Sequence, residues 1–181
     1  MKLLLSSLLN LYCLKHPCRL GCVLRCCGLG NCACAASYSR PNLQILCDSL
    51  KRIKKNFVVI SPNNDPGCEI IFKTIGKLPR SHFKQIPSMR FSYFSTLLKN
   101  SQVIIGNSSA GVREAPFLGV SSINIGSRQF KRGGAKSIKN FDVFKNKQLD
   151  RLVEKQWGKR FRADNSFGTG QSAKKFIKIL N

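Results

Sequence analysis

The sequence predicts an α/β fold whose core is a Rossmann-like parallel sheet. The first observation is a set of short, all-apolar runs, such as residues 57–60 and 103–105, with the composition of strands buried on both faces. The second is that segments with apolar residues at helical spacing lie between these runs. The third is the length, since 181 residues are enough for one domain with a core and too few for two full α/β domains. Strands that alternate with helices in this way form parallel sheets.

Each element is supported by its own pattern. Residues 42–55 predict a helix because Leu43, Leu46 and Leu50 fall on one face and basic residues gather near its end, where the helix dipole favours them. Residues 61–67 are rich in turn-forming Pro, Asn, Asp and Gly and predict a loop. The remaining expected elements, in chain order, are a strand at 57–60, a helix at 69–75, a strand at 83–86, a helix at 92–100 with Phe94, Leu97 and Leu98 facing inward, a strand at 103–105, a loop at 106–111 leading into a helix that ends near residue 118, a strand at 122–125, and helices at 148–153 and 171–180.

Residues 1–40 differ from the rest of the chain. They contain no acidic residue, and seven of the nine cysteines lie between Cys13 and Cys34. The first nine residues resemble a short signal peptide, with one positive charge before an apolar run, although no small-residue cleavage site follows. The remainder has neither strand nor helix periodicity. We therefore expect an irregular, cysteine-rich segment over residues 1–40 that is disordered or not native coding sequence, followed by one domain over residues 41–181.

The cysteines do not predict a disulfide framework or a metal centre. Their number is odd, no Cys-x-x-Cys pair repeats, and His16 is the only histidine near the cluster. We therefore expect no metal. Cys47 and Cys68 are isolated from the cluster and predict small apolar core residues of a reducing, cytoplasmic compartment.

The charge is strongly positive, since 31 Lys and Arg against 8 Asp and Glu give a net charge of +23. Such a balance attracts polyanions, including nucleic acid, a membrane surface or a phosphorylated small molecule. The basic residues are spread along the chain, so a solvated basic surface is an equal alternative. Few aromatic residues are interleaved with them and no binding motif accompanies them, so we expect no specific nucleic acid partner. No uncharged apolar run reaches 18 residues, so we expect no membrane span.

Two expected strand ends carry polar residues suited to a nucleotide ligand. After the strand at 103–105 come Ser108 and Ser109, whose hydroxyls, with the start of the following helix, would cradle a phosphate. Glu114 lies further along, where it can accept hydrogen bonds from a sugar. The next strand is followed by Arg128, a planar donor suited to a diphosphate. The alternatives are an ordinary serine N-cap followed by an acidic residue, and one solvated arginine among many.

Four motifs follow one another across the second part of the chain. They are residues 61–67 (Ser-Pro-Asn-Asn-Asp-Pro-Gly), 106–114 (Gly-Asn-Ser-Ser-Ala-Gly-Val-Arg-Glu), 124–129 (Asn-Ile-Gly-Ser-Arg-Gln) and 167–170 (Phe-Gly-Thr-Gly). In this order they resemble the hydrolysing UDP-N-acetylglucosamine 2-epimerases, in which the first is a Pro-Asn-x-Asp loop and the last a Tyr-Gly-x-Gly sequence. The resemblance covers residues 42–181 and implies the carboxyl-terminal, UDP-binding half of a GT-B fold, with no cofactor.

The resemblance also implies roles for individual residues and a partner. The ligand would be UDP-N-acetylglucosamine or UDP, and the full-length family implies a homo-oligomer. The implied contacts are Ser108 and Ser109 with the diphosphate, Glu114 with the ribose hydroxyls, Asn63 and Arg128 along the same site, and the backbone near Met89 with the uracil.

The implied activity is formation of N-acetylmannosamine and UDP for sialic acid-type sugars. In the family, a base removes the proton at C2, UDP leaves by elimination to give 2-acetamidoglucal, and water then adds. The carboxylates that act on the sugar lie in an amino-terminal domain without a counterpart here, and residues 30–34 stand where the family has His-Pro-Val-Thr-Thr. His82 does not replace that histidine, and we expect it at the surface. We therefore expect a truncated, inactive form, with a non-catalytic nucleotide-binding remnant or a basic nucleic-acid-binding protein as alternatives.

Overall fold

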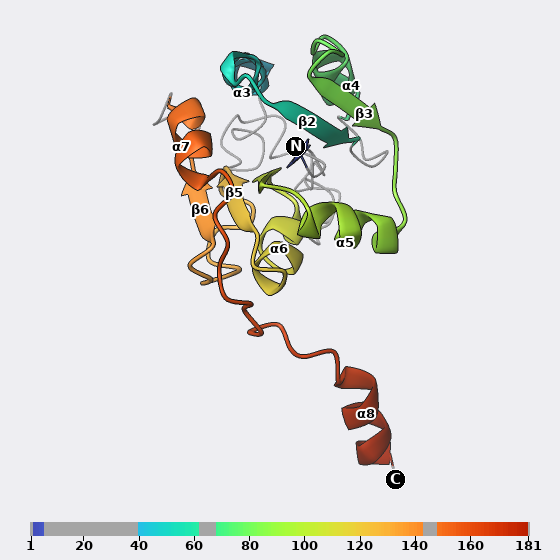
Figure 1. Cartoon of the computed structure of the whole chain (residues 1–181). Coiled ribbons are helices and arrows are strands. Elements are labelled where there is room, and N and C mark those ends of the chain that lie inside the picture. The colour runs from blue at the N-terminus through green and yellow to red at the C-terminus, as the bar shows by residue number, and fades with distance from the viewer. Residues whose placement is uncertain (1, 6–39, 62–67, 143–147, 181) are drawn as a thin grey trace, which may run out of the picture.

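The structure, a computed structural model, describes residues 2–5, 40–61, 68–142 and 148–180. At its centre is a six-stranded sheet in the order β3-β2-β1-β4-β5-β6, with every neighbouring pair parallel (Figure 1). The strands are β1 (Lys2–Leu5), β2 (Asn56–Ile60), β3 (Phe83–Ile86), β4 (Val103–Gly106), β5 (Ser121–Ile125) and β6 (Ile138–Phe141). The parallel α/β class predicted from the sequence is confirmed.

The strand order reverses at the centre of the sheet. From β1 the strands add outward to β3 on one side, whereas β4 to β6 add outward on the other side. The reversal lies between β1 and β4, which pair at Leu4 and Ile104. In an open parallel sheet, ligands bind in the crevice at such a switch point, beyond the carboxyl ends of the strands. The loop that follows β4 therefore lies where a ligand is expected.

Two strands differ from the sequence-based expectation. The sequence predicts an irregular segment over residues 1–40, but Lys2–Leu5 form a strand between β2 and β4. Three consecutive leucines suit a strand with neighbours on both sides, although four residues are too few to show a period. The sequence patterns do not predict strand β6, because its sequence, Ile-Lys-Asn-Phe, has only two apolar side chains. Residues 6–39, with the cysteine cluster, lie outside the described residues.

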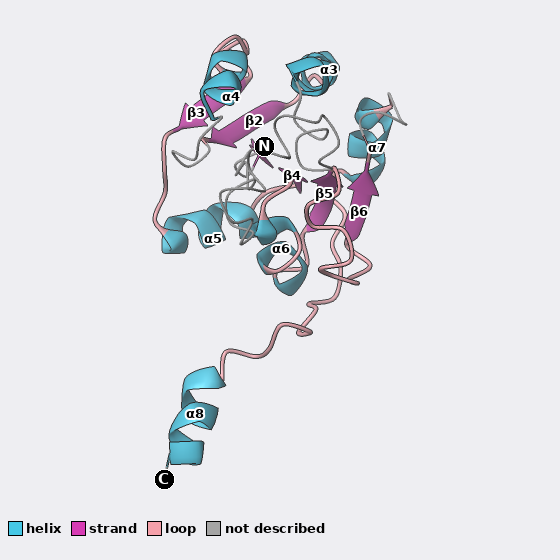
Figure 2. Ribbon diagram, turned by 180° about the vertical axis from the view of Figure 1, so that it is seen from behind, coloured by secondary structure: helices cyan, strands magenta, loops and turns pink. Residues whose placement is uncertain are grey.

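Helices cover both faces of the sheet (Figure 2). Along β2, the side chains of Phe57 and Val59 join one core cluster and that of Val58 joins the other, because successive side chains of a strand point to opposite faces. The first face is covered by α3 (Arg40–Arg52), α4 (Cys68–Ile75) and α7 (Leu149–Gln156), and the second by α5 (Phe91–Lys99), the 3-10 turn η1 (Ser109–Gly111) and α6 (Glu114–Phe117).

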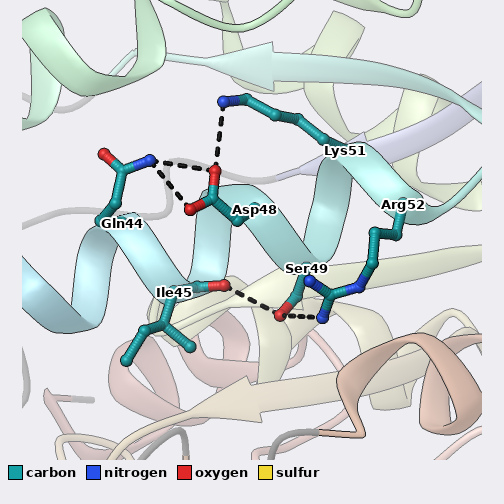
Figure 3. A network of polar contacts seen from close by, with 6 residues as sticks. All are labelled: Gln44, Ile45, Asp48, Ser49, Lys51 and Arg52. Carbon is teal, nitrogen blue, oxygen red and sulfur yellow. Dashed lines mark hydrogen bonds and ion pairs between the residues drawn. The ribbon is translucent and has the colours of Figure 1, made fainter.

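Helix α3 shows how its sequence pattern produces packing. Its apolar residues at helical spacing are all buried, namely Leu43, Leu46, Leu50 and Ile53. Its outer surface carries a polar network in which Gln44 Nε2 lies 3.0 Å from both carboxylate oxygens of Asp48, and Lys51 Nζ lies 3.2 Å from Oδ1 (Figure 3). The hydrogen bond from Gln44, followed by that from Lys51, holds the pKa of the Asp48 carboxyl below its ordinary value.

Of the two isolated cysteines, the structure describes the side chain of Cys47 alone. Cys47 is a free, buried residue of the core, as predicted, and burial raises the pKa of its thiol to about 11. Its thiol is therefore protonated and unreactive in the native state. The side chain of Cys68 lies outside the described part of the chain.

The last part of the chain crosses the side of the body that carries α6 and then leaves it. The Phe161 N–H donates to the Gly119 carbonyl at 2.9 Å, and the Asp164 N–H donates to the Pro116 carbonyl at 3.1 Å. Beyond these bonds the chain runs outward to α8 (Ser172–Leu180), whose residues are all exposed (Figure 1). Among the helices of the described ranges, none has the length and apolar content that a membrane span requires.

Candidate functional site

The loop after β4 brings small polar residues to the switch point. Strand β4 ends at Gly106, and Asn107, Ser108 and Ser109 follow it. The Ser108 hydroxyl caps η1 by accepting a hydrogen bond from the Ala110 N–H at 3.3 Å. Both serines are half-buried, and a hydroxyl that accepts one bond keeps its own hydrogen for donation.

The helix predicted after this loop is shorter than expected. The 3-10 turn η1 has three residues, and α6 spans only Glu114–Phe117. The interruption lies at residues 112–113, before α6, and Pro116 in the first turn of α6 lacks the N–H that a continuous helix would donate to the Val112 carbonyl. The expectation of one continuous helix to residue 118 is therefore wrong, and two short turns supply a much smaller dipole than a long helix.

Gly111 lets η1 lie directly on β5. A Cβ at this position would lie 2.8 Å from the Oγ of Ser122. Gly133 approaches the same region closely, since a Cβ there would lie 3.2 Å from the Val112 carbonyl oxygen. These two glycines hold the loop after β4 against β5 and the segment that follows it.

The loop after β5 reaches across to the loop after β4. Gln129 Nε2 donates to the Asn107 backbone carbonyl at 3.0 Å, and Arg128 Nη1 donates to the same oxygen at 3.3 Å. Gln129 is buried and Arg128 is half-buried. The structure therefore places Arg128 beside the loop that carries Ser108 and Ser109.

Several side chains near this edge have buried polar atoms without a partner in the described part of the chain. Asn107 is 0 % exposed, and neither its Nδ2 nor its Oδ1 is hydrogen-bonded. Asn124 on β5 donates to Asn140 Oδ1 at 2.7 Å, but its own Oδ1 has no partner. The Oε2 atom of Glu114 is also buried and unpaired. Buried polar atoms are nearly always hydrogen-bonded, so this concentration indicates a place for water or a ligand.

Glu114 also lines a cavity of about 380 Å³ on the side of the sheet that carries α5 and α6. The Arg113 guanidinium at its wall lies 5.1 Å from the ring centre of Phe167, within the range of a cation–π contact. Three aromatic side chains, Phe91, Phe117 and Phe167, and two carboxylates, Glu114 and Asp164, contribute to this wall. We name it the aromatic cavity.

The remaining predicted contacts are only partly described. Met89 is half-buried and lies two residues before Phe91, which begins α5 and lines the aromatic cavity. Asn63 lies outside the described residues. His82 is exposed, as predicted, with its Nδ1 3.3 Å from Asn56 Oδ1 at the opposite, amino edge of the sheet.

Sequence reasoning did not single out Asn107, Gln129 or Asn124 as important. Gln129 and Asn124 belong to the third of the four motifs, which was the available signal. Their contacts join residues 16 to 22 positions apart, so local patterns could not reveal them.

Across the described ranges, no group of three or more His, Cys, Asp or Glu side chains could hold a metal ion.

The sequence model of one protein family, described as UDP-N-acetylglucosamine 2-epimerase, matches residues 35–181. The chain belongs to this family. The match includes both strand-end loops, Glu114 and α8. The family identified from the four motifs is therefore confirmed.

Curated members of the epimerase family resemble this chain over part of their length. The UDP-N-acetylglucosamine 2-epimerase of Neisseria meningitidis is 39% identical over 130 residues, which are 70% of this chain and 34% of that protein. The hydrolysing UDP-N,N'-diacetylbacillosamine 2-epimerase of Legionella pneumophila is 28% identical over 140 residues, which are 77% and 34% of the two chains. Polysialic acid biosynthesis protein P7 of Escherichia coli is 36% identical over 92 residues, 50% and 24% of the two chains. The chain thus spans about a third or less of the length of these relatives.

Solved epimerase structures share the fold. The UDP-GlcNAc 2-epimerase of Methanocaldococcus jannaschii, solved with UDP-GlcNAc and UDP, superposes with a TM-score of 0.67 at 20% identity, over 99% of this chain and 45% of that one. Staphylococcus aureus MnaA, solved with UDP, gives a TM-score of 0.61 at 13% identity, over 99% and 44%. The expected fold, the carboxyl-terminal half of a GT-B arrangement, is confirmed.

Proposed function

We propose that this chain is the UDP-binding part of a hydrolysing UDP-N-acetylglucosamine 2-epimerase. The observation that supports this most is the junction of the two strand-end loops, where Gln129 and Arg128 donate to the Asn107 carbonyl. That junction holds the backbone before Ser108 and Ser109 beside a guanidinium, at the switch point where parallel sheets bind ligands. Hydroxyls and a guanidinium are donors matched to a diphosphate.

Each part of the nucleotide has a proposed contact. Ser108 and Ser109 donate from their hydroxyls to the diphosphate, and Arg128 adds a charged donor from the neighbouring loop. Glu114 accepts from the ribose hydroxyls, and its unpaired Oε2 supports this assignment because a buried acceptor requires a donor. We assign the uracil end to the backbone near Met89 and the rest of the same site to Asn63.

For the complete protein, the proposed reaction begins when a base removes the proton at C2 of the sugar. UDP then leaves by elimination to give 2-acetamidoglucal, and water adds to the double bond to give N-acetylmannosamine. Departure of UDP increases negative charge on the diphosphate, and donors held in position there lower the barrier. Ser108, Ser109 and Arg128 perform this part of the reaction. The base must lie within hydrogen-bond reach of its proton, and we assign it to the part of the relatives that this chain does not span.

The names of the relatives support the finer points of this proposal. The Legionella relative is described as hydrolysing, and the Escherichia coli relative as a polysialic acid biosynthesis protein. We accordingly assign the complete protein to sialic acid-type sugar synthesis, and we further propose that it works in the cytoplasm as a homo-oligomer. The present chain, which does not span the region assigned to the base, binds UDP without turnover. Formation of N-acetylmannosamine by the purified chain would contradict this last point.

A thermal-shift titration with UDP tests the proposal. A ligand that binds only the native state raises the melting temperature. We expect UDP to raise the melting temperature of the wild-type chain and to lose this effect in Ser109→Ala and Glu114→Ala. The matched controls are Ser81→Ala and Glu154→Ala, which change exposed residues away from the strand-end loops and should keep the UDP response. A cooperative melt that UDP leaves unchanged in the wild-type chain would overturn the proposal.

A further inference from the structure

Two opposite charges lie in the wall of the aromatic cavity and do not pair with each other. Arg113 and Glu114 are neighbours in the sequence, and both line the cavity. Within the described ranges, neither of them belongs to an ion pair. The Oε2 atom of Glu114 is instead buried without a hydrogen-bond partner. A guanidinium donates through several N–H groups and pairs readily with a carboxylate, so a contact elsewhere must keep Arg113 from this oxygen.

The ring of Phe167 supplies that contact. Its centre lies 5.1 Å from the guanidinium carbon of Arg113, and the positive charge is attracted to the face of the ring. Phe167 begins the last of the four sequence motifs, and the contacts proposed for UDP give this motif no role. The cation–π contact connects the motif to the nucleotide site, because Phe167 and Glu114 line the same cavity.

Hydrogen bonds of its own segment hold Phe167 at the cavity wall. The Asp164 N–H donates to a backbone carbonyl of α6 at 3.1 Å, which ties the segment to the body of the protein. The Asp164 carboxylate accepts from the N–H of Ser166 at 2.9 Å and from the hydroxyl of the same residue. The Gly168 N–H donates to the Asn165 carbonyl at 2.8 Å and closes a turn around Phe167. The ring is therefore placed by backbone and side-chain bonds on both sides of it.

We propose that Phe167 is a positioning residue of the nucleotide site, whose ring retains the Arg113 guanidinium and so leaves the Glu114 carboxylate free for the ribose hydroxyls. This inference rests on the proposed contact between Glu114 and the ribose. Without the ring, the guanidinium pairs with the half-buried carboxylate and competes with the 2′-hydroxyl for it. Phe167 therefore determines how strongly the site distinguishes a ribonucleotide from a deoxyribonucleotide.

Calorimetric titration with UDP and with 2′-deoxy-UDP measures this distinction. Phe167→Leu keeps an apolar side chain but removes the ring face, and we expect the affinity for UDP to fall about fivefold, the effect of one partly exposed ion pair that binding must break. The affinity for 2′-deoxy-UDP should fall less, so the preference for UDP narrows. Phe167→Tyr keeps the ring and should restore the preference of the wild type. Phe72→Leu is the matched control on α4, since Phe72 is also exposed, and it should change neither affinity.

Removal of the competing charge separates this role from a merely structural one. In the double variant Phe167→Leu/Arg113→Gln, we expect an affinity for UDP within about twofold of that of Arg113→Gln alone. Both substitutions change exposed side chains, so without UDP these variants should melt as the wild type does.

Two results would overturn this inference alone. The first is a double variant that binds UDP as weakly as Phe167→Leu, because a ring that stacked on the nucleotide or only held its segment in place would not be replaced by the loss of Arg113. The second is equal affinity of the wild type and Phe167→Leu for UDP. An absence of UDP binding by the wild-type chain would instead overturn the proposed function, and this inference with it.

Discussion

The carboxyl edge and the amino edge of the sheet both gather polar side chains, but they are built differently. At the carboxyl edge, the loops after β4 and β5 are joined through the Asn107 carbonyl. At the amino edge, a hollow of about 190 Å³ is bordered by Arg80, His82 and Lys84, all of them exposed. Within the described part of the chain, no residue that lines the amino-edge hollow has a buried polar atom without a hydrogen-bond partner.

The difference teaches that positive charge by itself does not mark a ligand site in this chain. Exposed cations at the amino edge are solvated by water and need no other partner. At the carboxyl edge, the side chains of Gln129 and Arg128 hold the loop backbone through the Asn107 carbonyl, and the neighbouring polar atoms are buried, so an atom left unpaired there has a real free-energy cost. Position at the switch point and burial, together, distinguish the carboxyl edge from the amino edge.

The largest predicted effect is a loss of stability at the amino edge, at a residue with a structural role and no proposed ligand contact. Gly119, just before β5 on the amino edge, has a φ of 66°, and a Cβ there would collide with the Phe161 carbonyl oxygen. Gly119→Ala should lower the free energy of unfolding by about 3 kcal/mol, because backbone strain and overpacking act together. Urea denaturation measures the change. Gly134→Ala, whose Cβ would meet nothing within 4 Å, is the control and should be nearly neutral. Equal stability of the two variants would contradict the packing described for the last part of the chain.

The second prediction concerns the junction of the loops after β4 and β5, where Gln129 donates to the Asn107 carbonyl. Gln129→Leu keeps the volume of the side chain but removes a donor from the Asn107 carbonyl, and we expect a loss of about 1–3 kcal/mol. Gln85→Leu is the matched control, because Gln85 Nε2 also donates to a backbone carbonyl, that of Ile75, at 2.9 Å, but from an exposed position. Only Gln129→Leu should also reduce the thermal shift with UDP. If both variants lose stability equally and both keep the UDP response, the junction has no special role.

The junction also shows the limit of prediction from sequence. Elements with a strong local signal were predicted well, such as α3 with its four buried apolar residues and β4 with its continuous apolar run. Strand β1 was missed because its place depends on pairing with residues about fifty and a hundred positions away. The bond between Gln129 and Asn107 was missed for the same reason. The break between η1 and α6 could be predicted from the sequence, since the missing N–H of Pro116 is a local property.

The smallest predicted effect concerns Asp48 on α3, a surface charge whose contribution to the stability of the fold depends on pH. The pKa of Asp48 in the folded state lies below its ordinary value of 3.8, first through the hydrogen bond from Gln44. The carboxylate therefore stabilises the fold at pH values above 3.8, and this contribution is lost as the pH falls through the folded-state pKa. Because the side chain is exposed, we expect Asp48→Asn to cost about 0.5 kcal/mol or less at pH 7 and nothing at low pH. Urea denaturation at both pH values measures it. A larger cost at low pH than at pH 7 would contradict the direction of the shift.

The central claim is that UDP binds at the carboxyl edge of the sheet. Titration of the ¹⁵N-labelled chain with UDP, followed by backbone amide NMR, tests it residue by residue. We predict the largest chemical-shift changes at Asn107, Ser108, Ser109 and Gln129, with residues 80–84 at the amino edge unchanged. Changes concentrated at residues 80–84, or no change at any concentration of UDP, would contradict the account.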